Sequence, residues 1–520
     1  MRSTFAGLSI ASSGLFAAQR ALDITGHNIS NANTRGYSRQ RLNQAAQDPM
    51  SIVGGQGQLG LGVKMQFISQ VRDEMLDIKY RTEVNTLGEW EEKYNSISQI
   101  EAIFNEPTDT GIRKVMDNFF EGLNSLSKDP SSPTTRAVFI QSAVALAQNF
   151  NHMTDNFEKM IRDSNEEVES SVRSINSMGS QIAKLNKQIL EAELDGSRAN
   201  DLRDARNLLI DDLSKLVDIQ VKEVPISNGN TSTLSILIQG TPLVNHTDTN
   251  VLELETNIDH PMFLDGKNAM DSTGLISEER TDLSTIKVSN IKWASGSSLD
   301  QTKLGGTIGG QLQQRDGFKD ENKGIPYYIR FTSEFAKSFA DTINAAHKNG
   351  YALGENTAFL LDIFESNGGG IINAGNIRVN QDLLDDPTLL ALGGDSGAKD
   401  DNKNAIAMLE LRNNKNFVSQ IVYSPTSKIV LGEGTPEDVI KTMISTLGVD
   451  GQEAKRMFNN QQYLAEEIDS FRMSVSGVSQ DEEMSNMIKF QHAYNAAARM
   501  ITTVDEMIDV IINRMGRVGL

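Results

Sequence analysis

An apolar stripe runs along the C-terminal end of the chain, with spacings that alternate between three and four residues. No Pro or Gly interrupts the segment between Gly477 and Gly516. This spacing predicts a helix that packs in a coiled coil or a helical bundle. The stripe consists of Met487, Phe490, Tyr494, Ala497, Ile501, Val504, Ile508, Ile511 and Met515.

The stripe alone does not supply enough apolar burial to fold this helix. Burying one such side chain stabilises a protein by about 1.5–3 kcal/mol at most, whereas ordering one residue of backbone costs about 1–2 kcal/mol. Only a minority of the residues in the segment belong to the stripe, so the cost exceeds the gain. The segment therefore needs a partner, either elsewhere in the chain or in another copy.

A helix predicted over about residues 3–24 is a candidate for that partner. Small residues surround its apolar face and allow another helix to approach closely. Gly26 is expected to cap its C-terminus, and the following loop from Asn28 to Arg39 is rich in turn-forming Asn and Gly. The apolar face consists of Phe5, Leu8, Ala11, Leu15, Ala18 and Leu22.

Further helices are predicted where proline is absent, because proline breaks helix interiors. We expect a helical body made of long antiparallel helices, together with shorter ones. The ranges are 73–104, a long helix from Pro133 to about Ile189, 198–216, 331–346, 406–411 and 437–471.

Residues 221–304 have a different pattern, with more Ser, Thr, Asn and Gly and with short β-branched runs such as 234–238, 251–255 and 286–291. They predict a small β-rich insertion, and 349–403 predicts loops with minor elements. The fold class is thus mainly α, with paired terminal helices, a long-helix bundle and an outer β domain. We expect three nested domains: 1–65 with 476–520, which is disordered in the monomer, 66–220 with 305–475, and 221–304.

Charge and composition narrow the function. The chain has 49 Lys and Arg against 69 Asp and Glu, a net charge of −20, which disfavours nucleic acid and anionic membranes as partners. Residues 1–41 are locally basic, with five Arg and one Asp. The absence of Cys excludes disulfides and thiolate metal sites. No run predicts a transmembrane helix or a cleaved secretion signal, so we expect a cytoplasmic chain or one exported without a cleaved signal.

Candidate chemistry is weak. Residues 55–60 match GxGxxG, but an alternating strand pattern follows where a nucleotide site needs a helix, so a hairpin turn is expected. The six His have no metal-pair spacing, and the segment that starts at Asp400 fails the calcium-loop pattern at Ala405 and Leu411. We interpret Asp481–Glu483 as capping a helix N-terminus. We therefore predict no catalytic, cofactor-binding or metal-binding residues.

The two ends of the chain resemble the axial proteins of the bacterial flagellum, the family of rod, hook and hook-associated proteins. The loop NISNANTRGYSR carries that resemblance, and its motif residues here are Asn28, Asn31, Asn33, Gly36 and Tyr37. The C-terminal stretches SGVSQDEE and FQHAYNAAARMITTVDEM resemble the hook-associated proteins of the hook–filament junction. More weakly, so do GGTIGGQLQQRD, INAAHKNGY and DNKNAIAMLEL in the centre.

The resemblance implies a structural protein whose terminal helices pair and line the axial channel. It implies export through the flagellar type III apparatus, with a chaperone that binds the C-terminal segment. Outside the cell, about eleven copies are expected to form a ring between the hook protein and the next junction protein or flagellin. The residues expected to mediate subunit assembly are Phe5, Leu8, Leu15, Leu22, Met487, Phe490, Tyr494, Ile501, Val504, Ile508, Ile511 and Met515.

Two alternatives remain open. A hook or distal rod subunit of the same family is the first, although such proteins usually have a β-dominated middle. A surface enzyme or ligand-binding protein is the second, and the lack of a convergent acid, base, nucleophile or metal set argues against it.

Overall fold

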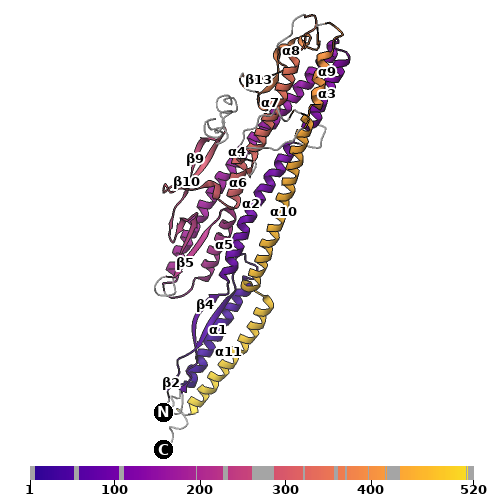
Figure 1. Cartoon of the computed structure of the whole chain (residues 1–520). Coiled ribbons are helices and arrows are strands. Elements are labelled where there is room, and N and C mark those ends of the chain that lie inside the picture. Colours follow the sequence, from indigo (N-terminus) through magenta and orange to yellow (C-terminus); the bar gives the residue numbers. More distant parts are fainter. Residues whose placement is uncertain are drawn as a thin grey trace, which may run out of the picture. The chain divides into compact units, whose positions relative to one another are not determined.

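The computed structural model is mainly helical with small β-sheets, as the sequence predicts (Figure 1). Contacts divide the chain into two compact units. Three helices contribute residues to both: α2 (Glu74–Phe104), α4 (Pro133–Ala192) and α10 (Pro436–Ser476). The structure describes residues 6–51, 58–104, 111–194, 196–225, 232–260, 286–319, 322–355, 361–368, 370, 372–395, 398–415, 417, 434–510 and 512.

The first unit combines three stretches of the chain: Met1–Asn85, Ser174–Val251 and Gln462–Leu520. It contains whole helices as well as the ends of the shared ones. The helices are α1 (Ala6–Ser30), the start of α2 (Glu74–Phe104), the end of α4 (Pro133–Ala192), α5 (Asn200–Leu216), the end of α10 (Pro436–Ser476) and α11 (Gln480–Asp509).

Two sheets and a short ladder belong to the first unit. The strands β1 (Gln40–Ala46) and β4 (Val63–Gln70) pair antiparallel, and β2 (Met50–Ser51) pairs with β3 (Gln58–Leu59) between them. This agrees with the hairpin expected around the GxGxxG match, although residues 52–57 lie outside the described part. A four-stranded antiparallel sheet has the order β5 (Gln220–Pro225), β6 (Ser232–Ile238), β7 (Thr241–Asn245) and β8 (Asp248–Thr249).

The alternating pattern of β6 confirms the strand prediction for that segment. Leu234, Ile236 and Ile238 are all buried, while the residues between them are half-buried. One face of the strand therefore packs into the unit, which is what a period of two predicts. A tight turn at Gln239 and Gly240, both with positive φ, leads into β7.

The second unit comprises Thr86–Arg173 and Leu252–Gln461. Its core is rich in aromatic side chains: Phe119 packs against Phe139, Phe339 and Phe364, with ring centroids 5.2–6.0 Å apart. Besides its parts of α2, α4 and α10, the unit contains α3 (Ile112–Lys128), β9 (Leu252–Asp259), β10 (Lys287–Trp293), η1 (Gln301–Lys303), α6 (Gly306–Asp316), β11 (Phe318–Lys319), β12 (Asn322–Lys323), α7 (Ile325–His347), β13 (Phe364–Ser366), β14 (Ile377–Val379), α8 (Gln381–Asp385), η2 (Pro387–Leu389), α9 (Lys403–Glu410) and η3 (Leu411–Asn413).

Several details of the helix prediction were wrong; helix α6 (Gly306–Asp316), for example, lies in none of the predicted ranges. The first helix does not end at Gly26 but continues to Ser30, because two side chains bond the carbonyls of its last turn: Ser30 Oγ donates to Gly26 O and Asn31 Nδ2 to His27 O. Helix α3 was not predicted at all, although it buries Met116, Phe119 and Leu123 at helical spacing.

The predicted three-part division stays a prediction. The β-rich segment 221–304 contributes β5–β8 to the first unit and β9 and β10 to the second. In the described part of the chain, no helix has an apolar stretch long enough to cross a membrane.

Candidate functional site

Helices α1 and α11 pack along each other within the first unit (Figure 1). Near the start of α1, a Cβ atom placed on Gly7 would lie 3.7 Å from Val504 Cγ2, towards the end of α11. Near the end of α1, Asn28 bonds Glu483 in the first turn of α11. The two helices therefore run antiparallel, and each provides a packing partner for the other.

The residues predicted for assembly lie along these helices, and those described are only half-buried in a single copy: Leu8, Leu15, Leu22, Met487, Phe490, Tyr494, Ile501, Val504 and Ile508. Most of the buried positions of α1 are instead small, such as Ala17 and Ala21, although Ile24 and Asn28 are also buried. Phe5, Ile511 and Met515 lie outside the described side chains. Contacts of this set with other copies stay a prediction.

The start of α11 has the capping arrangement inferred from its acidic triplet. Ser479 is the N-cap, and its hydroxyl accepts a bond from the backbone of Glu482. Carboxylates in this first turn interact favourably with the helix dipole. No local sequence pattern indicates the second role of Glu483, whose side chain is buried at 2% exposure and bonds to the N-terminal segment.

Asn28 is the centre of the motif loop. Its Nδ2 donates to Gln40 O at 2.9 Å and to Glu483 Oε2 at 3.1 Å, and its Oδ1 accepts from Tyr37 Oη at 2.8 Å and from Gln40 N at 3.0 Å. All four bonds available to an amide side chain are made. Asn28 therefore joins three segments: the end of α1, the start of β1 and the start of α11.

The other motif residues shape the loop around Asn28. Asn31 accepts a bond from the Thr34 hydroxyl at 3.2 Å. Gly36 has φ +81°, a conformation that side chains disfavour, and a Cβ there would lie 3.1 Å from Leu208. Burial, helped by nearby carboxylates, raises the pKa of the Tyr37 phenol, so this hydroxyl remains a donor. Asn33 is exposed.

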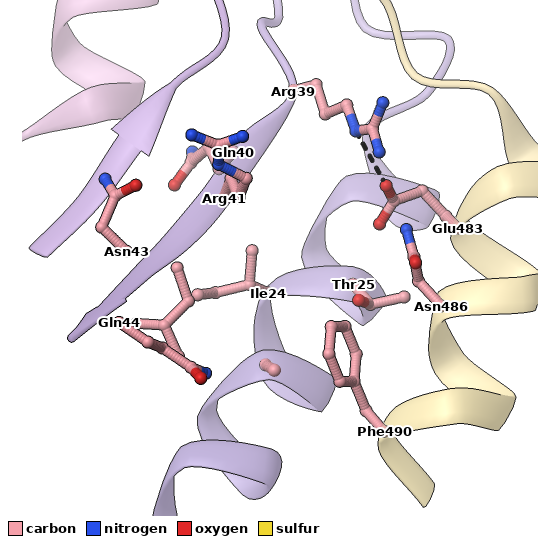
Figure 2. A pocket seen from close by; sticks show the side chains of 12 residues that line it. Ile24, Thr25, Arg39, Gln40, Arg41, Asn43, Gln44, Glu483, Asn486 and Phe490 are labelled. Atoms are coloured by element: carbon pink, nitrogen blue, oxygen red, sulfur yellow. Dashed lines mark ion pairs between the residues drawn. The ribbon is translucent and has the colours of Figure 1, made fainter. Parts of the chain in front are cut away.

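Arg39 connects the loop to both helices at the other end of the chain. Its Nε lies 3.0 Å from Glu483 Oε1 and its Nη1 2.8 Å from Glu482 Oε2, and its backbone N donates to Ser476 O at the end of α10. Figure 2 shows the ion pair of Arg39 and Glu483 at the rim of an open pocket of about 490 Å³. Ile24 and Thr25 of α1, Gln40 and Asn43 of β1, and Asn486 and Phe490 of α11 line the pocket.

A second polar network holds the same loop on α5. The Asp204 carboxylate accepts from Ser38 N at 2.9 Å, from Ser38 Oγ at 2.7 Å and from Gln70 Nε2 at 2.7 Å, and Arg72 lies 3.5 Å away. Burial raises the pKa of Asp204 against the opposing effect of these bonds. The loop is thus fixed by polar contacts on two sides, which suits a rigid surface.

Arg472 forms a similar centre at the end of α10. Its guanidinium lies 2.5 Å from Asp211 and 3.7 Å from Asp77, and it stacks over the Tyr80 ring at 4.0 Å. These contacts tie α10 to α5 and to the start of α2.

This arrangement is suited to holding helices together rather than to chemistry. Around the pocket lie amides, two Arg, one carboxylate, the Thr25 hydroxyl and apolar side chains, and among the described residues the Thr25 hydroxyl has no hydrogen bond to a base. Throughout the described ranges, no three His, Asp or Glu side chains are grouped to bind a metal.

Three family models match the chain. The model of the flagellar hook-associated protein FlgK helical domain matches residues 97–361. The C-terminal model of the flagellar basal body rod FlgEFG proteins matches residues 470–515, and the flagella basal body rod protein model matches residues 8–37. The match over residues 470–515 contains the whole of α11, and the match over residues 8–37 contains most of α1.

Relatives match over nearly the full length. Flagellar hook-associated protein 1 of Bacillus subtilis is 34% identical, with 99% of each chain covered. The proteins of the same name from Salmonella typhimurium and Escherichia coli are 25% identical, with 97% of this chain and 98% of theirs covered.

The fold is similar to that of the flagellar hook junction protein FlgK from Burkholderia pseudomallei, with a TM-score of 0.53 at 16% identity. The match covers 78% of this chain and 100% of that structure. The relatives are structural proteins, in keeping with a site that has no catalytic arrangement. The paired terminal helices, the helical-domain match and the full-length relatives together place this chain in the flagellar hook-associated protein 1 (FlgK) family.

Proposed function

We propose that this chain is a structural subunit of the bacterial flagellum that assembles at the tip of the hook and joins the hook to the filament. The observation that carries the proposal is the pairing of α1 with α11, in the two stretches matched by rod-protein models. The work of such a subunit is mechanical, since it adapts a bending hook to a rigid filament.

The half-buried seam supports a role in assembly. In one copy the seam residues of α11 remain partly accessible, and Met484 and Ile488 beside them are more than half exposed. Apolar side chains left accessible along a helix mark a surface for a further partner. Docking at the hook tip supplies that partner and orders the terminal coiled coil.

The finer partners are part of the proposal, by analogy with the family. About eleven copies form a ring, which contacts the hook protein on one side and the next junction protein or flagellin on the other. The chain leaves the cell through the flagellar type III export apparatus. An export chaperone covers the C-terminal segment until then and protects it from aggregation. The mature location is extracellular, at the hook–filament junction.

A hook or distal rod subunit is the second candidate, because the models that match both ends describe rod proteins. The helical-domain match over residues 97–361 favours the junction protein. Circular dichroism separates the two, since a hook-type subunit would have a much lower helix content.

The decisive experiment is genetic. A strain that lacks this gene is expected to make hooks without filaments and to release flagellin into the medium, and the intact gene in trans is expected to restore filaments. Normal filaments in the deletion strain would contradict the proposal.

A further inference from the structure

The loop that joins β13 to β14 in the second unit begins with an Asn-Gly pair, Asn367 and Gly368. In such a pair the backbone nitrogen of the glycine can attack the side-chain carbonyl carbon of the asparagine, because glycine has no side chain to obstruct the approach. The reaction is intramolecular, so its rate depends on how freely the two groups can meet. The sequence contains two more Asn-Gly pairs, at Asn349 and at Asn228, and Asn228 lies outside the described residues.

The surroundings of Gly368 leave its nitrogen open to this reaction. Gly368 has φ +103°, and a Cβ placed on it would meet nothing within 4 Å. Asn367 and Gly368 are both exposed, and within the described ranges the Gly368 N–H has no hydrogen-bond acceptor. The backbone of Asn367 is held, since its N–H donates to Asn376 O at 2.7 Å. The loop thus fixes the asparagine and leaves the attacking nitrogen without a competing hydrogen bond.

Arg378 lies beside the carbonyl group that would be attacked. It pairs with Glu365 across the two strands at 2.8 Å, and its Nη1 lies 3.4 Å from Asn367 Oδ1. A positive charge in this position stabilises the negative charge that develops on the carbonyl oxygen during the attack.

The pair of Asn349 and Gly350 has the same two residues in different surroundings. Asn349 is also exposed, but Gly350 is buried and its N–H donates to His347 O at 3.0 Å. A Cβ placed on Gly350 would collide with Asn404 and Ala391. The Gly350 nitrogen must break its hydrogen bond and leave this packing before it can react, which requires local unfolding.

We propose that Asn367 is a site of spontaneous deamidation in the folded chain. The Gly368 nitrogen loses its proton to hydroxide and forms a bond to Asn367 Cγ, and the side-chain nitrogen leaves as ammonia. Water then opens the succinimide ring at one of its two carbonyl carbons, which yields aspartate or isoaspartate. Water is the only other reactant, and the backbone nitrogen regains its proton when the ring opens.

The modification changes the charge around Arg378. Aspartate in place of Asn367 gives the guanidinium a second carboxylate beside that of Glu365, and bonds between charged groups are stronger than those of a neutral amide. Isoaspartate carries the same charge and also adds one carbon atom to the backbone of the loop. The hairpin of β13 and β14 therefore acquires a negative charge that the gene does not encode and that accumulates with the age of the molecule.

Peptide mapping by mass spectrometry tests the proposal on the purified full-length chain after incubation at neutral pH. Cleavage after Glu355 and Glu365 places Asn349 and Asn367 in different peptides, and the aspartate and isoaspartate products separate by chromatography. We expect Asn367 to deamidate about tenfold faster than Asn349, because Gly350 must first give up a hydrogen bond and its packing. In an Asn367→Gln variant, the loop peptide should keep its mass.

The same chain in urea distinguishes the effect of the fold from that of the sequence. Unfolding removes the protection of Gly350, so the rates at Asn349 and Asn367 are expected to come within about threefold of each other. Equal rates in the native chain, or no reaction at Asn367 while the unfolded chain reacts, would overturn the proposal. A native difference that persists unchanged in urea would also overturn it, because neighbouring residues rather than the fold would then set the rates. The measurement needs no flagella, so its outcome is independent of the proposed function.

Discussion

The Arg39 guanidinium lies 3.0 Å from the Glu483 carboxylate, although the two residues are near opposite ends of the sequence. The Glu483 side chain is nearly inaccessible, and its other oxygen accepts from Asn28. A buried carboxylate with two donors is stabilised only while both donors remain in place. This pair therefore fixes the position of α11 relative to the loop after α1.

Replacing Glu483 by Gln is expected to destabilise the first unit by about 2 kcal/mol, because the amide offers one acceptor oxygen to two donors. Glu482→Gln is the matched control, since Glu482 also pairs with Arg39 but is largely exposed, and exposed pairs contribute about 1 kcal/mol or less. Amide hydrogen exchange in α1 measures the destabilisation that each of the two variants causes. Equal protection in the two variants would show that burial of Glu483 has no special effect.

Gly36→Ala is expected to lower the free energy of unfolding of the first unit by about 1–2 kcal/mol. A positive φ is unfavourable for residues with a Cβ, and Leu208 lies close to that Cβ position. Gly14→Ala should instead stabilise by up to about 1 kcal/mol, since Gly14 is helical with open space around it. Urea unfolding followed by a probe in the first unit compares them. A neutral Gly36→Ala variant would contradict the strained-turn interpretation.

His347 should make the second unit sensitive to acid. Burial lowers its pKa from 6.5 to about 4, and the ring bridges two loops: Nδ1 donates to Leu361 O and Nε2 accepts from Ala391 N. Because the pKa is lower in the folded state, neutral His347 makes its full contribution to the free energy of unfolding above about pH 6.5. That contribution is lost as the pH falls towards 4.

Between pH 7 and pH 4, His347 is expected to lower the free energy of unfolding of the second unit by about 3 kcal/mol. This loss adds to any loss from carboxylates that become protonated. His347→Gln, which keeps an acceptor and a donor, provides the comparison, and hydrogen exchange of α7 at both pH values reports it. The same pH dependence in both proteins would refute the assignment.

Ile501→Asp with Ile508→Asp should leave the second unit folded and prevent incorporation at the hook tip. Both residues are half-buried in the seam with α1, and full burial of each on assembly would contribute about 1.5–3 kcal/mol, which the Asp variants cannot gain. Thr502→Asp, exposed between them, should be incorporated normally. Export into the medium is measured separately, because the same face is expected to bind the chaperone. Normal incorporation of the double variant would exclude the seam as an assembly surface.

Limited proteolysis tests whether the ends are ordered before assembly. We expect the purified monomer to lose residues up to about 65 and from about 475 rapidly, leaving a resistant core, because the α1–α11 pair buries mostly small and half-exposed side chains. Assembled flagella should protect both ends. Monomer ends as resistant as the core would contradict this expectation.

Local patterns were enough to predict most of the helices. The α2 prediction differs from the structure by one residue, and α4 begins at the predicted Pro133. Helix α3 was missed although Met116, Phe119 and Leu123 repeat at helical spacing; a search for the 3.6 period between residues 104 and 133 would have found it.

The polar part of the site was beyond the reach of sequence patterns. The acidic first turn of α11 predicts a helix start, but nothing local distinguishes buried Glu483 from exposed Glu482. The distinction depends on where Arg39 and Asn28 lie after folding. In the same way, the end of α1 depends on bonds from Ser30 and Asn31 that compete with a glycine stop.

Helix α1 packs against α11, and most of the sequence lies between these two helices. Contacts so distant in sequence form late in folding. A product cut short before residue 480 would carry an orphan α1, however well the rest had folded. Pairing across such a span therefore makes the burial of α1 depend on synthesis of the chain through α11.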